Sequence, residues 1–138
     1  MNAKYQLPKD GGLAKESAPK DIVHRYEKIP TRVFENEYNG VQYIADIICR
    51  MVRQHGENAS ARDIYEELPP FVLGLTTGRT PLGLHRELVK RYQAGEISFA
   101  NVAVYSLDEF YPIRSTDQQS RNYRIHDEFL KFIDIAPE

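Results

Sequence analysis

The sequence has no tryptophan, only two methionines and a single cysteine, Cys49. A lone cysteine excludes a disulfide within the chain, so this is not a disulfide-stapled scaffold. Cys49 also lies on the apolar side of a helical pattern, which favours a small buried side chain over a nucleophile. No run of about 18 apolar residues is present, and the first six residues lack the apolar core of a signal peptide. These absences predict a cytoplasmic protein that does not enter a membrane.

A strong excess of either charge is also lacking. Eighteen basic and twenty acidic side chains give a net charge of −2, so no global field draws the chain to nucleic acid or to a membrane surface. Any anion that it binds must therefore be captured locally. With 41% hydrophobic and 28% charged residues, the 138 residues have the composition of a globular chain and allow one domain or part of one.

Residues 71–81, with the sequence FVLGLTTGRTP, form the most informative stretch of the chain. Residues 71–75 predict a buried strand, a Thr/Gly turn follows, and Thr80 and Pro81 are typical of an N-cap and a first helical residue. A strand that turns directly into a helix aims backbone N–H groups at one point, which favours phosphate binding. The turn lacks a P-loop lysine and the G-x-G-x-x-G pattern, and an ordinary βα turn capped by its threonines is the alternative.

The remaining pattern alternates strands and helices. Residues 1–30, poor in large apolar groups, predict a flexible N-terminal extension, and residues 31–34 predict a short strand. Apolar spacing predicts a helix over 38–54 that stops at Gly56. A helix start at Ser60 suggests a further short helical turn before the central strand.

A second helix is predicted after Pro81, ending at Gly95. Its expected inward residues are Leu84, Leu88, Val89 and Tyr92, and its expected solvated residues are His85, Arg86, Glu87 and Lys90. A strand over 101–107 follows. This alternation is typical of an α/β fold with a parallel sheet and right-handed crossovers.

Two acids, Asp108 and Glu109, directly follow the strand over 101–107. In parallel sheets ligands bind at the carboxyl ends of the strands, where the Thr/Gly turn also lies. A carboxylate at this edge is suited to moving a proton on a phosphorylated substrate. The alternative is that one acid caps a turn and the other is solvated; the position favours a function for Asp108 and leaves Glu109 open.

The last predicted helix begins at Ser120, a natural N-cap, and turns Ile125, Phe129 and either Phe132 or Ile133 inward. His126 and Asp127 are neighbours on this helix and therefore face different ways, so they do not form part of a catalytic triad.

Taken together, these motifs resemble the glucosamine-6-phosphate deaminase family, also called glucosamine-6-phosphate isomerases. The resemblance covers residues 31–135 in order and spacing, and it is carried by residues 71–81, 94–99 and 107–110 and by Ser120, Tyr123 and His126. It implies a modified Rossmann-like α/β fold with a parallel sheet flanked by helices. It also implies conversion of glucosamine 6-phosphate to fructose 6-phosphate and ammonia without a metal or organic cofactor.

The resemblance assigns roles to individual residues. Asp108 matches the family aspartate that moves a proton between C2 and C1, a role suited to a carboxylate that is partly shielded from water. Thr76 and Glu109 are further candidates for the substrate site. The residues expected to hold the substrate phosphate, largely by backbone N–H groups, are Thr77, Gly78, Arg79 and Thr80. Many relatives have glycine or serine in place of Arg79, so either this turn avoids a positive φ there or a guanidinium adds to phosphate recognition.

The family's later acid–base cluster and its later basic phosphate ligands lie beyond Glu138. Residues 31–138 are therefore expected to be the amino-terminal part of an incomplete domain, inactive alone and homo-oligomeric when complete. A 6-phosphogluconolactonase-like hydrolase is a close alternative, but its acidic pair is typically followed by arginine, where this chain has Phe110. A non-catalytic sugar-phosphate-binding effector domain is a second alternative, which would not need Asp108.

Overall fold

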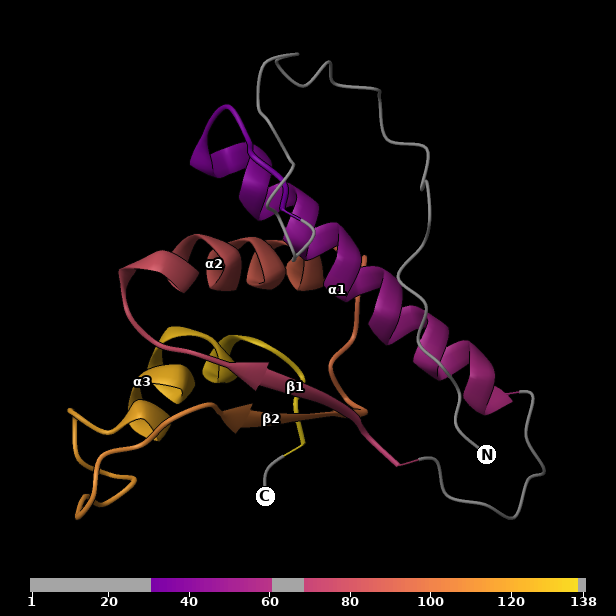
Figure 1. Ribbon diagram of the computed structural model, residues 1–138. Coiled ribbons are helices and arrows are strands. Elements are labelled where there is room, and N and C mark those ends of the chain that lie inside the picture. Colours follow the sequence, from indigo (N-terminus) through magenta and orange to yellow (C-terminus); the bar gives the residue numbers. More distant parts are fainter. Residues whose placement is uncertain (1–30, 61–68, 137–138) are drawn as a thin grey trace. The chain divides into compact units, whose positions relative to one another are not determined.

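The computed structural model describes residues 31–60 and 69–136, although not the side chains of 58–60. The chain divides into two units, Met1–Arg32 and Val33–Glu138, and all the elements described below belong to the second. In order, these are α1 (Glu37–Ser60), β1 (Phe71–Leu75), α2 (Arg79–Gln93), β2 (Val102–Ser106), α3 (Arg121–Glu128) and a 3₁₀ turn, η2 (Leu130–Phe132) (Figure 1). The predicted extension over 1–30 lies outside the described residues.

Helix α1 is longer than predicted at its carboxyl end. Asn36 begins it by accepting the Asn39 N–H on Oδ1 at 2.9 Å, and Glu37 adds an acid to the first turn. The predicted stop at Gly56 is wrong, because Gly56 is an ordinary helical residue and the helix continues to Ser60. One glycine within a helix costs only about 1 kcal/mol, which a long packed helix tolerates. Ser60 is the last described residue of α1, so it does not begin a separate helix, and the rest of the helical turn predicted from it lies outside the described residues.

The strand predicted over 31–34 is also wrong. These residues have no regular structure, and the Phe34 ring instead packs at 5.3 Å from the ring of Tyr43 on α1. A strand needs a neighbouring strand for its backbone groups, and in the described part of the chain only β1 and β2 pair with each other.

Strands β1 and β2 lie side by side in parallel, with Phe71 opposite Val102 and Leu75 opposite Ser106 (Figure 1). Helix α2 is the crossover between them, so the predicted α/β fold is confirmed. The prediction that β1 is a buried strand holds for one face of β1 only, because only one face of the strand pair is covered. Val72 is 62% exposed and Tyr105 is 59% exposed.

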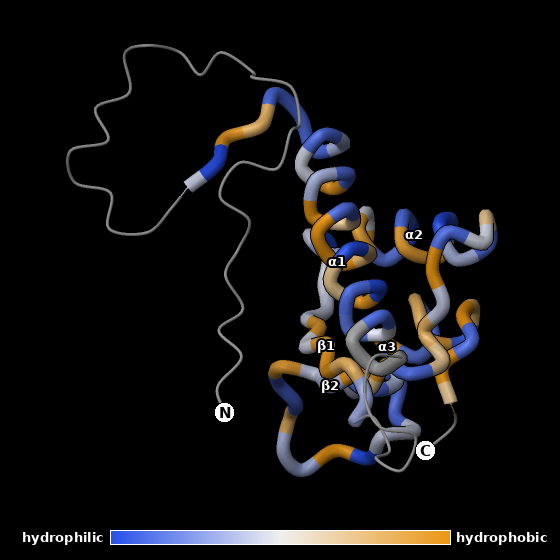
Figure 2. The backbone as a smooth tube through the Cα atoms, turned by 90° about the vertical axis from the view of Figure 1, so that its right-hand side faces the viewer, coloured by the Kyte–Doolittle hydropathy of each residue, from blue (hydrophilic) through white to orange (hydrophobic). Residues whose placement is uncertain are grey.

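The covered face of the sheet packs into a core to which residues from α1 to the segment after α3 contribute. Its buried residues are Ala45, Cys49, Leu75, Leu88, Ile97, Phe99, Val102, Ile125 and Phe129. The predictions for Cys49, Leu88, Ile125 and Phe129 are therefore confirmed. The alternation of apolar and polar residues along α1 and α2 is visible in Figure 2 and gives each helix one face for packing.

His85 is an exception to the predicted helix faces. It was expected among the solvated residues of α2, but it is fully buried and its ring stacks on Phe129 at 5.5 Å. The same expectation is wrong for Glu87, whose side chain is only 11% exposed. Near the end of the chain, Ile133 packs against the core whereas Phe132 is exposed, which settles which of the two turns inward.

Arg91 joins α2 to α1. Its guanidinium donates to Glu87 at 2.9 Å, to Asp46 at 2.6 Å and to the side chain of Gln42 at 2.9 Å, while its own side chain is only 10% exposed. These charge-assisted bonds compensate the burial of the guanidinium.

Among the helices in the described part of the chain, none has the length and apolar character that a membrane span requires. The cytoplasmic location stays a prediction.

Candidate functional site

The carboxyl ends of the two strands lie at the same level. Leu75 ends β1 opposite Ser106, which ends β2, and the Leu107 N–H donates to the Leu75 carbonyl at 2.9 Å. The Thr/Gly turn and Asp108 therefore emerge at one edge of the sheet, as predicted.

The turn itself differs from its prediction in one respect. Helix α2 begins at Arg79, with Gly78 as its N-cap, so Thr80 is a helical residue rather than the cap. Gly78 has φ 111°, a left-handed value that favours glycine, and it reverses the chain between strand and helix. Pro81 still lies in the first helical turn, where a missing N–H costs no hydrogen bond.

This geometry also explains how arginine is accommodated at position 79. The left-handed backbone falls on Gly78, so Arg79 adopts an ordinary helical conformation with an exposed side chain. No side chain caps the start of α2, which leaves its first N–H groups without a side-chain acceptor in the described part of the chain. A helix start of this kind is suited to an anion. Thr76 makes only a local contact, from its hydroxyl to the Thr77 carbonyl at 3.5 Å.

Asp108 lies beside this turn with an accessible carboxylate. Its side chain is 55% exposed, so the protein covers a little less than half of it, and the catalytic role of Asp108 stays a prediction. Its backbone is held by the Ser106 hydroxyl, which donates to the Asp108 carbonyl at 2.6 Å. The carboxylate is paired with Arg121 Nε at 3.2 Å and is otherwise open to a ligand from solvent.

Glu109 has a different environment although it is the next residue. Its carboxylate accepts backbone N–H groups from Arg121, Asn122 and Phe110 and the Ser120 hydroxyl, at 2.8–3.2 Å. The hydrogen bond from the Arg121 N–H, together with the others, lowers the pKa of Glu109 to about 2. Glu109 therefore caps the start of α3, and its suggested place in the substrate site stays a prediction.

Ser120 completes this start of α3. Its hydroxyl oxygen accepts the Tyr123 N–H at 3.2 Å, which confirms Ser120 as the N-cap. Asp127, farther along α3, pairs with Lys131, in agreement with the prediction that it forms no triad with His126.

Arg121 is the site residue that the sequence did not reveal. It is the first residue of α3, and its Nη1 donates to the Thr77 hydroxyl at 2.9 Å while its Nε donates to Asp108. The same guanidinium lies over the Phe110 ring, 4.5 Å from its centroid. Its position just after an N-cap was visible in the sequence, but nothing there indicated that α3 begins next to the Thr/Gly turn.

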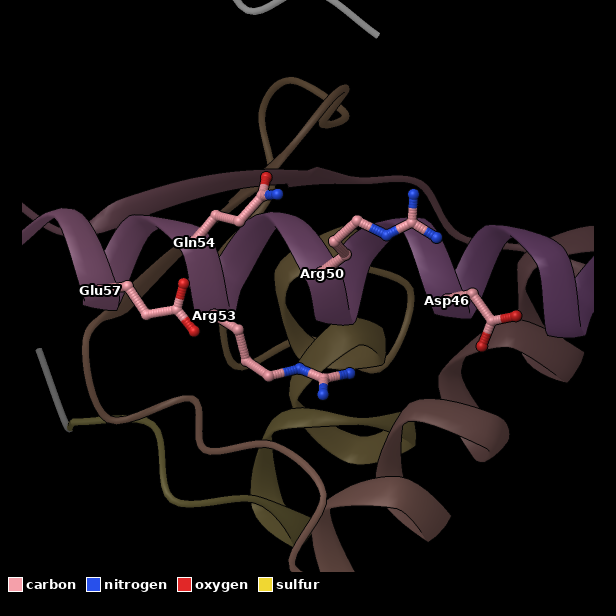
Figure 3. A pocket seen from close by; sticks show the side chains of 5 residues that line it. All are labelled: Asp46, Arg50, Arg53, Gln54 and Glu57. Carbon is pink, nitrogen blue, oxygen red and sulfur yellow. The ribbon is translucent and has the colours of Figure 1, made fainter. Parts of the chain in front are cut away.

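A separate cavity of about 350 Å³ lies along α1, lined by Asp46, Arg50, Arg53, Gln54 and Glu57. None of these belongs to the predicted site. Figure 3 shows that Arg50 and Arg53 extend away from each other, so the two positive charges do not converge on one point. Arg53 is also used within the helix, where its Nε donates to the Cys49 carbonyl at 3.2 Å. We therefore retain the sheet edge, rather than this cavity, as the candidate functional site.

Within residues 31–60 and 69–136, no three histidine, cysteine, aspartate or glutamate side chains gather as a metal-binding group would require. The expectation of a reaction without metal or organic cofactor stays a prediction.

Comparison with known proteins identifies the relatives of this chain. No protein-family profile matches it. It is 34% identical over 107 residues to a glucosamine-6-phosphate deaminase of Treponema denticola, covering 77% of this chain and 37% of that protein. It is 36% identical over 104 residues to the glucosamine-6-phosphate deaminase of Haemophilus ducreyi, covering 75% of this chain and 36% of that protein. The chain thus spans little more than a third of the length of these relatives.

Solved structures give the same result. A monomeric glucosamine-6-phosphate deaminase, described as a missing link of the NagB superfamily, matches with a TM-score of 0.62 and 29% identity over 75% of this chain and 38% of its own. A 6-phosphogluconolactonase from Leishmania guyanensis matches with a TM-score of 0.50 and 21% identity over 77% of this chain and 37% of its own, which shows a shared fold alone. The chain is thus similar to glucosamine-6-phosphate deaminases over about three quarters of its own length, and it matches about 37% of the length of these relatives.

Proposed function

We propose that this chain is part of a longer enzyme that converts glucosamine 6-phosphate to fructose 6-phosphate and ammonia, and that it supplies the phosphate-binding turn and the proton-transfer carboxylate. The observation that carries the proposal is the meeting of Thr77 and Asp108 at one sheet edge, where both contact Arg121. The similarity of the chain to glucosamine-6-phosphate deaminases supports the choice of substrate.

In this proposal the substrate phosphate binds at the start of α2. The N–H groups of residues 77–80 donate to the phosphate oxygens, and the exposed Arg79 guanidinium adds positive charge. The turn holds the phosphate end of the sugar and so places the other end near Asp108. The free hydroxyl of a simple sugar lacks the negative charge that this turn favours, so the phosphate determines which substrates bind.

Asp108 is then the base that removes the proton from C2 of the open-chain sugar and returns it to C1. Together with the movement of one proton from the C2 amine to the C1 oxygen, this transfer turns the C1 aldehyde and C2 amine into a C1 alcohol and a C2 imine. Water hydrolyses the imine, which releases ammonia and leaves the C2 ketone of fructose 6-phosphate. The exposed carboxylate can reach a substrate directly. Ring opening needs further acid–base groups that we place outside this chain, so the chain alone is inactive.

The test is ammonia release by the complete protein with glucosamine 6-phosphate as substrate. Asp108→Asn should lower kcat by about 100-fold or more while binding of the sugar phosphate is kept, because the amide cannot act as a base. Asp127→Asn, a change at an acid on α3 that pairs with Lys131, is the matched control and should leave turnover unchanged. Normal turnover by the Asp108→Asn enzyme would refute the catalytic assignment.

A lactonase activity is the second candidate, because one observation favours it. The lactonase pattern places an arginine next to the acidic pair, and Arg121 brings a guanidinium over Phe110, the residue in that position. Hydrolysis of 6-phosphogluconolactone by the complete protein, in the absence of ammonia release from the amino sugar, would support this candidate instead. A domain that binds sugar phosphates and is unaffected by Asp108→Asn would be an effector domain.

A further inference from the structure

Arg121 belongs to a different element from the other residues of the candidate site. The turn follows β1 and Asp108 follows β2, whereas Arg121 begins α3. Its guanidinium joins the other two, with Nη1 on the Thr77 hydroxyl at 2.9 Å and Nε on Asp108 Oδ2 at 3.2 Å. It is therefore the one side chain, among the described residues, through which the phosphate turn and the acid are connected.

We propose that Arg121 is a positioning residue, which holds the Asp108 carboxylate at a set place relative to the phosphate turn; this inference rests on the function proposed above. Asp108 is more than half exposed, and in the described part of the chain no other side chain forms a hydrogen bond or an ion pair with its carboxylate. Without Arg121 the carboxylate would rotate freely about its side-chain torsions. A base that is displaced from its substrate by about 1 Å loses a large part of its rate.

The guanidinium is suited to this task because of its shape. Its Nε and Nη1 groups lie in one rigid plane, so bonds from both fix the distance between their two acceptors. The Phe110 ring, 4.5 Å from the guanidinium carbon, limits the rotation of that plane. A lysine has the same charge but a single nitrogen on a flexible stem, and it cannot reproduce the two directed bonds.

Glu109 supports the same arrangement from the backbone. Its carboxylate accepts the N–H of Arg121 at 3.0 Å and the hydroxyl of Ser120 at 2.8 Å, so the first residue of α3 is anchored beside the acidic pair. The two neighbouring acids therefore have separate tasks. Glu109 holds the backbone of Arg121, and the side chain of Arg121 holds Asp108.

The experiment compares Arg121→Lys and Arg121→Gln with wild type in the complete protein, measuring kcat and KM for glucosamine 6-phosphate. We expect both variants to lower kcat by about 10- to 100-fold and to change KM by less than about threefold, because binding is kept and the base is misplaced. Arg124→Lys, at an exposed arginine on the same helix, is the matched control and should behave as wild type. A double-mutant cycle with Thr77→Val should show that Arg121→Lys costs less once the Thr77 hydroxyl is gone.

A large rise in KM with an unchanged kcat would overturn the proposal, because it would make Arg121 a phosphate ligand instead. Full activity of Arg121→Lys would overturn it as well. The rate of the wild-type protein tests the proposed function separately. If wild type releases no ammonia, crystal structures of the complete wild-type and Arg121→Gln proteins decide: a single Asp108 rotamer that becomes several supports the positioning role, and an unchanged Asp108 side chain refutes it.

Discussion

His85 offers a sharp test of how the core is built, because it is a polar side chain without polar partners. The imidazole is fully buried, and in the described part of the chain neither ring nitrogen has a hydrogen-bond partner. A neutral imidazole has one donor and one acceptor, and each buried group left unpaired costs about 1–3 kcal/mol. Leucine has a similar volume and no polar atoms. Replacement also loses the stacking on Phe129 and some fit of shape, together about 1 kcal/mol.

The two unpaired ring nitrogens together cost about 2–6 kcal/mol, so His85→Leu should raise the free energy of unfolding by about 1–5 kcal/mol at pH 7.5. Burial lowers the pKa of His85 in the folded state, so the unfolded chain takes up a proton below pH 6.5 while the folded chain does not. Stability of the wild type is thus lost as the pH falls from 6.5 toward the folded-state pKa. At pH 5.5 the difference between variant and wild type should be larger than at pH 7.5 by up to about 1.4 kcal/mol.

The assay is urea unfolding of both proteins at pH 7.5 and 5.5, followed by circular dichroism. Taking the difference between the two proteins cancels the titration of the other histidines. His126→Gln, at an exposed position on α3, is the control for replacing a histidine outside the core. A variant that is less stable than wild type, by an amount that does not change with pH, would show that His85 is hydrogen-bonded in the folded protein and that the reasoning fails.

Two further predictions concern the anchors of the helices. Glu109→Gln should lower the Tm at pH 7, and the difference from wild type should shrink as the pH falls from 4.5 toward 2. The depressed pKa of Glu109 contributes its full stability above pH 4.5, and this contribution is lost progressively as the pH falls toward 2. An acid unfolding series checks this, and a constant difference would contradict the capping role. Arg91→Met should lower the free energy of unfolding, measured in urea at pH 7, by about 3 kcal/mol, because Glu87 and Asp46 lose their shared partner. Lys90→Met, on the exposed face of α2, should lower it by less than about 0.5 kcal/mol. Equal costs for Arg91→Met and Lys90→Met would contradict the importance of the Arg91 contacts.

The parts of the fold that the sequence predicts correctly are those decided by neighbouring residues. Strands β1 and β2 follow from short apolar runs, and Ser120 caps α3 through its own hydroxyl. Gly95, predicted to end α2, has φ 73°, which few residues other than glycine adopt. Each of these features depends on at most a few adjacent residues, so local chemistry is sufficient to predict them.

The predictions are wrong where the structure depends on packing between elements, or on which of two neighbouring residues takes a given position. Gly56 is a plausible helix stop by residue type, but α1 continues because nothing at that point turns the backbone to a left-handed value. Thr80 is a plausible N-cap, but Gly78 takes that position because the tight reversal after β1 requires its φ of 111°. His85 is polar, yet its place on α2 faces Phe129. A residue's type cannot show which of two neighbours is selected or which helix face meets the core.

The candidate site shows the same division at the level of chemistry. A strand that ends before Asp108 and Glu109 predicts that two acids lie at the carboxyl edge, but not which of them points to solvent. That choice depends on the segment after β2, which returns the start of α3 to the acidic pair and engages the Glu109 carboxylate. Because Glu109 binds the start of α3, the Arg121 guanidinium lies beside the acidic pair. Its Nε is 3.2 Å from Asp108 Oδ2 and its Nη1 is 2.9 Å from the Thr77 hydroxyl. The arrangement of charge around Asp108 thus depends on a contact between segments that are far apart in sequence. The sequence therefore indicates both acids but not Arg121, which lies 13 residues after Asp108.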